Sequence, residues 1–174
     1  GSWLYQLTYF WGVFLFGLAA LPIIISLVVT LYSLFLNLIK VFKRNSGKIL
    51  NTSSTASFMP GPLQAVYFAT KAYVTFFSNA LSEELHNTNI TVTNLMPGAT
   101  ETEFGAISGM DKTEMFRKTA TARSVAEDGY NGMVKGKIDV VSGLTTSQKI
   151  MMAMIPFMPK KMILRQVRQM QEIK

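Results

Sequence analysis

The sequence predicts an α/β fold, in which a parallel sheet with flanking helices follows a long hydrophobic helical segment. Residues 48–54 and 90–95 are short apolar runs typical of strands, and residues 63–87 between them carry apolar side chains at helical spacing. A strand, a helix and a second strand in this order form a right-handed crossover, which makes the two strands parallel. Residues 3–39, in contrast, contain no charged side chain.

The first predicted domain covers residues 1–45, which we interpret as a membrane-embedded helical segment. About 20 apolar residues are enough to cross a bilayer, and this uncharged run is longer. Aromatic residues cluster at its start, and Lys40, Lys43 and Arg44 follow its end, as expected at the two interfaces of a membrane. We therefore expect membrane lipid as a partner and a membrane-associated location. The alternative is a buried helix over residues 24–44 that packs on the chain's own sheet.

The composition excludes several kinds of site. The 174 residues include no cysteine, so disulfides, thiolate metal sites and cysteine nucleophiles are excluded. The single histidine, His86, stands near a predicted helix end, and we expect no metal site. The net charge is +7, and residues 149–174 carry most of this excess. Their basic side chains are interleaved with Met, Ile and Leu, which favours an apolar or anionic membrane surface over nucleic acid as a partner.

The second predicted domain, residues 46–174, continues beyond the crossover. We expect a polar lid or substrate loop at 99–122, a helix at 124–137, a third strand at 138–143, and two helices separated by a proline joint after residue 147. Ser124 is the predicted N-cap of the first of these helices, with Glu127 at the capping-box position. The last helix is basic and amphipathic from Lys160 to Arg168, and we predict that it lies on a surface. The alternative is a helix that covers the substrate loop.

Tyr67 and Lys71 are the first candidate site residues. They stand four positions apart on the predicted helix, so their side chains project side by side. Because a cation beside a phenol favours the phenolate, such a pair suits proton transfer near neutral pH. The alternative is two ordinary side chains on the surface of an amphipathic helix. Ser53, Ser54, Pro97 and Gly98 lie at the carboxyl ends of the two predicted strands, which is where sites in parallel sheets lie. We expect these residues to meet at one edge.

The motifs around these residues resemble a known family. The stretch "GKILNTSS" ends at Ser54, 13 residues before Tyr67, and "YFATK" matches a Y-x-x-x-K motif. The segment "NLMPGATETEF" is similar to a P-G-x-x-x-T motif that follows a strand. In this order and spacing, residues 46–143 resemble the catalytic half of a short-chain dehydrogenase/reductase, which implies part of a Rossmann-like sheet.

The resemblance implies a role for each motif residue. Tyr67 would exchange a proton with the substrate oxygen, Lys71 would favour the phenolate and hold the nicotinamide ribose, and Ser54 would polarise the substrate oxygen. The residues expected to contact the cofactor are Pro97, Gly98 and Thr102. The alternative for Ser54 and Thr102 is a loop hydroxyl that bonds to nearby backbone. The substrate expected for an active enzyme is a small apolar carbonyl compound or alcohol.

The chain also departs from the family pattern. The T-G-x-x-x-G-x-G turn that holds the pyrophosphate occurs nowhere, and Ser26 and Thr30 stand where an assisting asparagine is expected. We therefore expect NADP or NAD to bind the isolated chain weakly or not at all. Our first hypothesis is a membrane-anchored oxidoreductase of this type, with its first half missing or supplied by another chain. The second is a non-catalytic subunit of a membrane complex that retains the back half of the fold.

Overall fold

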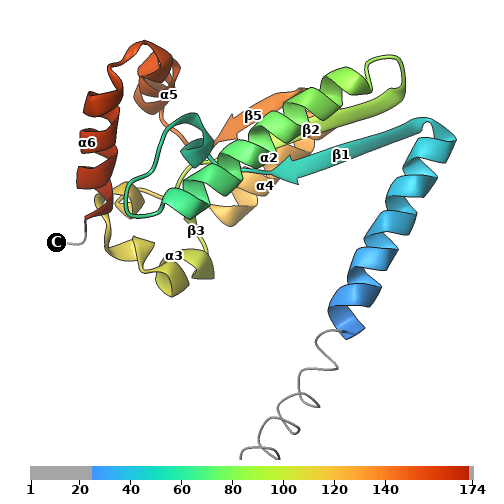
Figure 1. Cartoon of the computed structure of the whole chain (residues 1–174), viewed down its shortest axis with the longest axis horizontal. Helices are drawn as coiled ribbons and strands as arrows, with labels where there is room; N and C mark the ends of the chain where they lie inside the picture. Colours follow the sequence, from blue (N-terminus) through green and yellow to red (C-terminus); the bar gives the residue numbers. More distant parts are fainter. Residues whose placement is uncertain (1–24, 173–174) are drawn as a thin grey trace, which may run out of the picture. The chain divides into compact units, whose positions relative to one another are not determined.

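The computed structural model describes residues 25–172 and divides into two units, the second of which begins at Ser46. In the first unit a single helix is described, Ile25–Arg44 (Figure 1). Most of its large apolar side chains are exposed. Its mean hydropathy of 2.0 and its 20 residues are sufficient for a membrane span. The predicted apolar helix is thus confirmed. The aromatic cluster predicted for its start lies outside the described residues.

The second unit is built on a three-stranded sheet. Its strands are β1 (Ser46–Thr52), β2 (Asn89–Pro97) and β5 (Asp139–Ser142), which lie in the order β1-β2-β5 and are all parallel. The predicted parallel sheet is therefore confirmed. β1 ends two residues earlier than expected, because Ser54 is the N-cap of the 3-10 turn η1 (Thr55–Phe58). The side-chain oxygen of Ser54 accepts a hydrogen bond from the Ala56 amide.

Two helices, α2 (Ala65–Glu84) and α4 (Ala122–Val134), cover opposite faces of this sheet (Figure 1). Asn94 of β2 donates to Thr75 of α2, whereas its neighbour Leu95 lies against Gly129 of α4. Successive strand residues point to opposite faces, so these two contacts assign one helix to each side. α2 begins at Ala65 and not at the predicted residue 63, because Leu63 has the left-handed φ of 71°.

A row of polar side chains crosses the sheet under α2. Asn51, Asn94 and Asp139 are neighbours in register on the three strands. Asn94 donates to Asp139 at 2.9 Å, and Asn51 donates to Ser78 of α2 at 3.0 Å. Ser78 and Asn94 are fully buried, so the partners of these hydrogen bonds are closely constrained. This row determines how α2 lies on the sheet and therefore where its first turns stand.

The N-terminus of α4 differs from its prediction. Thr121 is the N-cap, and its side chain accepts from the amide of Ser124, which lies three residues inside. The predicted cap at Ser124 is therefore wrong. Glu127 pairs with Arg123 at 3.0 Å on the helix surface and does not complete a capping box.

Gly132 of α4 packs directly against the sheet. A Cβ at this position would lie 2.2 Å from a methyl carbon of Val140 in β5. We expect Gly132→Ala to lower the free energy of unfolding by about 1–3 kcal/mol, the usual cost of overpacking a core. Chemical denaturation measures this change. Asn131→Ala, one residue earlier on the exposed side of the helix, should change it by about 0.5 kcal/mol or less, and equal effects of the two variants would contradict the packing described.

The predicted lid is a chain of short elements. It contains β3 (Thr100–Glu101), α3 (Glu103–Ser108), the 3-10 turns η2 (Met110–Lys112) and η3 (Glu114–Phe116), and β4 (Ala120–Thr121). β3 and β4 pair in parallel and so hold the two ends of the segment together. Gly109, with a φ of 69°, ends α3.

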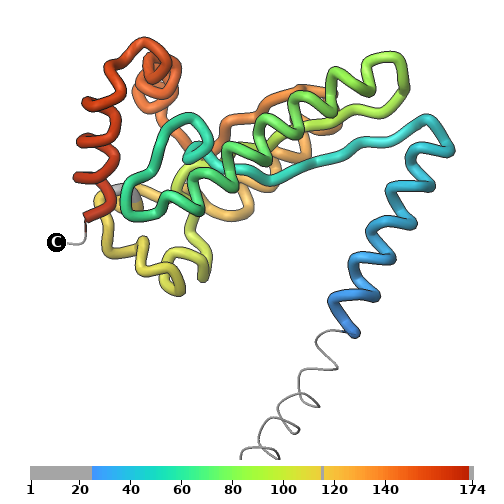
Figure 2. Tube along the Cα trace, viewed as in Figure 1, coloured from blue at the N-terminus to red at the C-terminus, as the bar shows by residue number. Residues whose placement is uncertain are grey.

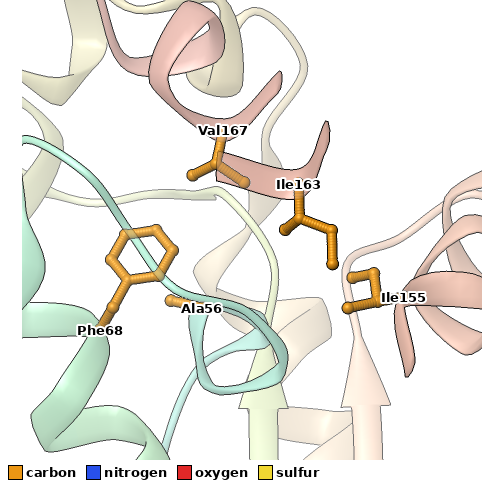
Figure 3. Packing of buried hydrophobic residues seen from close by; sticks show 5 residues of the cluster. All are labelled: Ala56, Phe68, Ile155, Ile163 and Val167. Carbon is orange, nitrogen blue, oxygen red and sulfur yellow. The ribbon is translucent and has the colours of Figure 1, made fainter. Parts of the chain in front are cut away.

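The C-terminal segment forms α5 (Thr146–Met154), the turn η4 (Ile155–Phe157) and α6 (Lys160–Gln171), as the predicted proline-broken pair (Figure 2). The apolar face of α6 packs in the core: Ile163 and Val167 are buried against Phe68, Ala56 and Ile155 (Figure 3). The prediction that α6 lies on a surface, not in the core, is therefore wrong. The alternative, a covering helix, describes it correctly, because its apolar stripe finds a partner within the chain.

Candidate active site

A cavity of about 650 Å³ opens at the carboxyl ends of β1 and β2. Its wall includes all six residues that the sequence singled out, together with side chains from α3, α5 and α6. The six residues are Ser54, Tyr67, Lys71, Pro97, Gly98 and Thr102. Its volume is within the range of about 300–1,000 Å³ that is typical of small-molecule sites.

Tyr67 and Lys71 lie together on the first turns of α2. The Lys71 Nζ atom stands 5.8 Å from the centre of the Tyr67 ring and donates to the Thr52 carbonyl oxygen at 3.3 Å. Both side chains are half-buried. Partial burial lowers the pKa of the Lys71 ammonium below its ordinary value, because desolvation disfavours the charged form. The pair is therefore a phenol beside a partly desolvated cation, held to the end of β1.

Ser54 combines a local role with a place on the cavity wall. Its Oγ atom accepts from the Ala56 amide at 3.1 Å and donates to the Pro97 carbonyl oxygen at 3.4 Å. The local backbone bond considered as an alternative for Ser54 is thus present. Among residues 25–172, no hydrogen bond joins Ser54 to the Tyr67 hydroxyl, so the two are associated only by lining the same cavity.

The segment after β2 supplies the opposite part of the wall. The Gly98 amide donates to the Ser142 carbonyl oxygen at 2.9 Å, and a Cβ at Gly98 would lie 2.7 Å from the Leu144 side chain. Glycine is therefore required here by close packing against the end of β5. Thr102 is the N-cap residue of α3, but its side chain makes no capping hydrogen bond. Thr102 is exposed and lines the cavity.

Two further residues contribute to the site: Phe104, which was not predicted, and Ser53, which was predicted only to lie at the strand end. Phe104 of α3 stacks on the Tyr67 ring, with 5.6 Å between ring centres and 30° between planes. Ser53 is buried; its hydroxyl donates to the Lys71 carbonyl oxygen at 2.8 Å and bonds to the Thr75 hydroxyl, also at 2.8 Å. A signal for Phe104 existed, since an aromatic residue stands two positions after Thr102. The contacts of Ser53 depend on how α2 lies on the sheet, which the sequence does not show.

The short chain dehydrogenase family matches residues 24–112, about half of the chain. The protein belongs to this family. Among its relatives is the very-long-chain 3-oxoacyl-CoA reductase of Mus musculus, which is 42% identical over 82 residues. That match covers 45% of this chain and only 26% of the mouse protein. The family match also contains the whole of the N-terminal helix Ile25–Arg44.

Solved structures of the family share the fold. A short-chain dehydrogenase from Sphingobium yanoikuyae in complex with NADPH is 25% identical, with a TM-score of 0.56, and the match covers 64% of this chain and 43% of that one. A 7beta-hydroxysteroid dehydrogenase is 20% identical, with a TM-score of 0.62 over 81% of this chain and 55% of that one. The chain thus has the Rossmann-like fold of short-chain dehydrogenases and spans about half of their length or less.

The residues present fit the nicotinamide end of a dinucleotide cofactor better than its pyrophosphate. The Lys71 ammonium, the Thr102 hydroxyl and the backbone at Gly98 are groups suited to ribose hydroxyls and a carboxamide. A pyrophosphate requires a glycine-rich turn between a strand and a helix. The turn between β1 and α2 contains a single glycine, Gly61. A Cβ there would lie 2.1 Å from the Phe68 ring, so glycine is needed at this position to leave room for that ring.

Proposed function

We propose that this chain supplies the catalytic half of an NAD(P)-dependent oxidoreductase that interconverts carbonyl compounds and alcohols. The observation that carries the proposal is the presence of Tyr67, Lys71 and Ser54 on the wall of one cavity at the carboxyl ends of parallel strands. Membership of the short chain dehydrogenase family supports it. The mouse relative is named as a 3-oxoacyl-CoA reductase, which supports a ketone as the group that reacts.

The chemistry divides between cofactor and chain. When bound, a reduced nicotinamide supplies the hydride that reduces the carbonyl carbon. The Tyr67 hydroxyl gives its proton to the carbonyl oxygen, so that one hydride and one proton convert the ketone to the alcohol. Ser54 donates a hydrogen bond to the same oxygen, exchanging its long bond to Pro97 for this contact. Lys71 favours the phenolate left on Tyr67 and orients the nicotinamide ribose.

Lys71 gives a test of this assignment through the pH dependence of alcohol oxidation. In Lys71→Ala, oxidation of a secondary alcohol with NADP or NAD should appear at a higher pH than in the wild type, because the phenolate loses its neighbouring cation. Lys71→Arg retains a charge and should give a profile closer to that of the wild type. The profiles are measured in membranes from cells that express each full chain, so that partners are retained. Superimposable profiles for Lys71→Ala and the wild type would refute the assigned role.

The second candidate function is a non-catalytic subunit that keeps this half of the fold as a packing module. One observation favours it: the sequence contains no T-G-x-x-x-G-x-G turn. The two functions differ in whether the Tyr67 hydroxyl is needed. A packing module needs the polar row under α2 but not the Tyr67 hydroxyl, whereas the oxidoreductase needs both.

A membrane location is also part of the proposal. The helix Ile25–Arg44 is long and apolar enough to cross a bilayer, and most of its large apolar side chains are exposed. We expect the chain to remain in the pellet after membranes are extracted with alkaline carbonate. Release into the supernatant would contradict a spanning helix. It would support the alternative, a core helix of the dehydrogenase fold, since the family match includes this helix.

A further inference from the structure

The far wall of the cavity is unusually rich in methionine. Six of the 11 methionines of the chain line it, and they are Met59, Met110, Met151, Met152, Met158 and Met170. Most of them come from α5, α6 and the segment between these helices, which is remote in sequence from Tyr67. The cavity therefore extends from the polar residues at the strand ends to an apolar region under the C-terminal helices.

This apolar region excludes charge. Residues 146–171 include five cationic side chains, at positions 149, 160, 161, 165 and 168. None of the five contributes to the cavity wall, to which this segment adds only Gln148 and Gln166 besides apolar residues. The charged residues of the wall come from other segments: they are Lys71, Glu114, Arg117 and Lys118, of which Arg117 pairs with Glu114 at 3.1 Å. The part of a ligand that lies against α5 and α6 therefore meets only uncharged side chains of these helices, most of them apolar.

The residue type also indicates the shape of the ligand. Methionine is unbranched and flexible, so a wall of thioether side chains can repack around many conformations of a flexible chain. We infer that the cavity binds a long, unbranched apolar chain, with the carbonyl or hydroxyl carbon that reacts lying at Tyr67 and the chain extending along the methionine wall. This inference rests on the proposed function, since it deepens the substrate class of the same site.

A binding measurement tests the inference without turnover. The saturable binding of radiolabelled alkan-2-ones with six to 12 carbons to the purified full chain is measured by equilibrium dialysis. Burial of each added methylene should lower the Kd about fourfold until the cavity is filled. A rigid steroidal ketone should bind at least about tenfold more weakly than the longest alkan-2-one. A Kd that does not depend on chain length, or tighter binding of the steroid, would overturn the inference.

A matched pair of variants places the binding in the cavity. Met152 is half-buried on the wall, whereas Met162 is 54% exposed on the outer side of α6 and does not line the cavity. Met152→Gln should raise the Kd of the 12-carbon ketone about tenfold, and Met162→Gln should leave it unchanged within about twofold. Equal effects of both variants would place the binding elsewhere and overturn the inference. The binding assay contains no cofactor and therefore does not depend on catalysis. If binding depended on chain length but the full chain with its partners reduced no ketone, only the proposed function would be refuted.

Discussion

Tyr67→Phe is expected to lower kcat for ketone reduction by about 10²- to 10⁴-fold, the usual contribution of a positioned general acid. The substitution removes only the hydroxyl, so the ring still stacks on Phe104 and meets Phe68 edge-on. The fold should therefore be retained. The measurement is the steady-state rate of NADPH- or NADH-dependent reduction of a methyl ketone by the full chain with its partners retained, together with circular dichroism of the purified chain.

Tyr73→Phe is the matched control for this substitution. Tyr73 lies on the same helix, is 68% exposed and does not line the cavity. Its loss should leave kcat unchanged within about twofold. If Tyr67→Phe retained full activity, the pair of Tyr67 and Lys71 would be an inherited feature of the helix, and the packing-module function would be favoured.

The isolated chain is expected not to bind NADPH or NADH measurably at micromolar concentration. The motif that holds the pyrophosphate in this fold is absent from the sequence. The space beside Gly61, the one glycine between β1 and α2, is occupied by the Phe68 ring. Loss of these contacts should weaken binding by several kcal/mol, which corresponds to a Kd about 10³-fold higher or more. Calorimetric titration of the purified chain measures the affinity.

A complete short-chain dehydrogenase, titrated in parallel, provides the positive control. A micromolar Kd for this chain alone would contradict the prediction and would require another phosphate site. The same titration of Lys71→Ala would then show whether the Lys71 ammonium contributes to that binding, since it is a cation on the cavity wall that belongs to the family motif.

The sequence predicted the parts of the fold that depend on local pattern. The crossover from β1 through α2 to β2 follows from hydrophobic periodicity, and the spacing of Tyr67 and Lys71 places them on one helix face whatever surrounds them. The position of α6 did not follow from its pattern. A basic amphipathic helix suits both a membrane surface and a core, and only the tertiary contacts of Ile163 and Val167 with Phe68 distinguish them.

Local pattern was also insufficient at the edges of the site. The pattern predicts a strand up to Ser54, but the chain turns there because the Ser54 side chain caps η1. The predicted capping residue of α4 lies three positions too late, because Ser124 is at least as good an N-cap residue type as Thr121. The stack of Phe104 on Tyr67 depends on the conformation of a polar, glycine-containing segment that carries little periodic signal.

Transfer of deuterium tests the assignment of this cavity as a carbonyl–alcohol oxidoreductase site most directly. Membranes from cells that express the full chain are incubated with dodecan-2-one and NADPH deuterated at the transferable position, and the alcohol is analysed by mass spectrometry. Membranes that contain Tyr67→Phe at equal abundance provide the background from other reductases. We expect deuterium at the carbinol carbon in excess of that background for the wild type and for Tyr73→Phe. Equal deuterium in the wild-type and Tyr67→Phe membranes would contradict a catalytic role for this site.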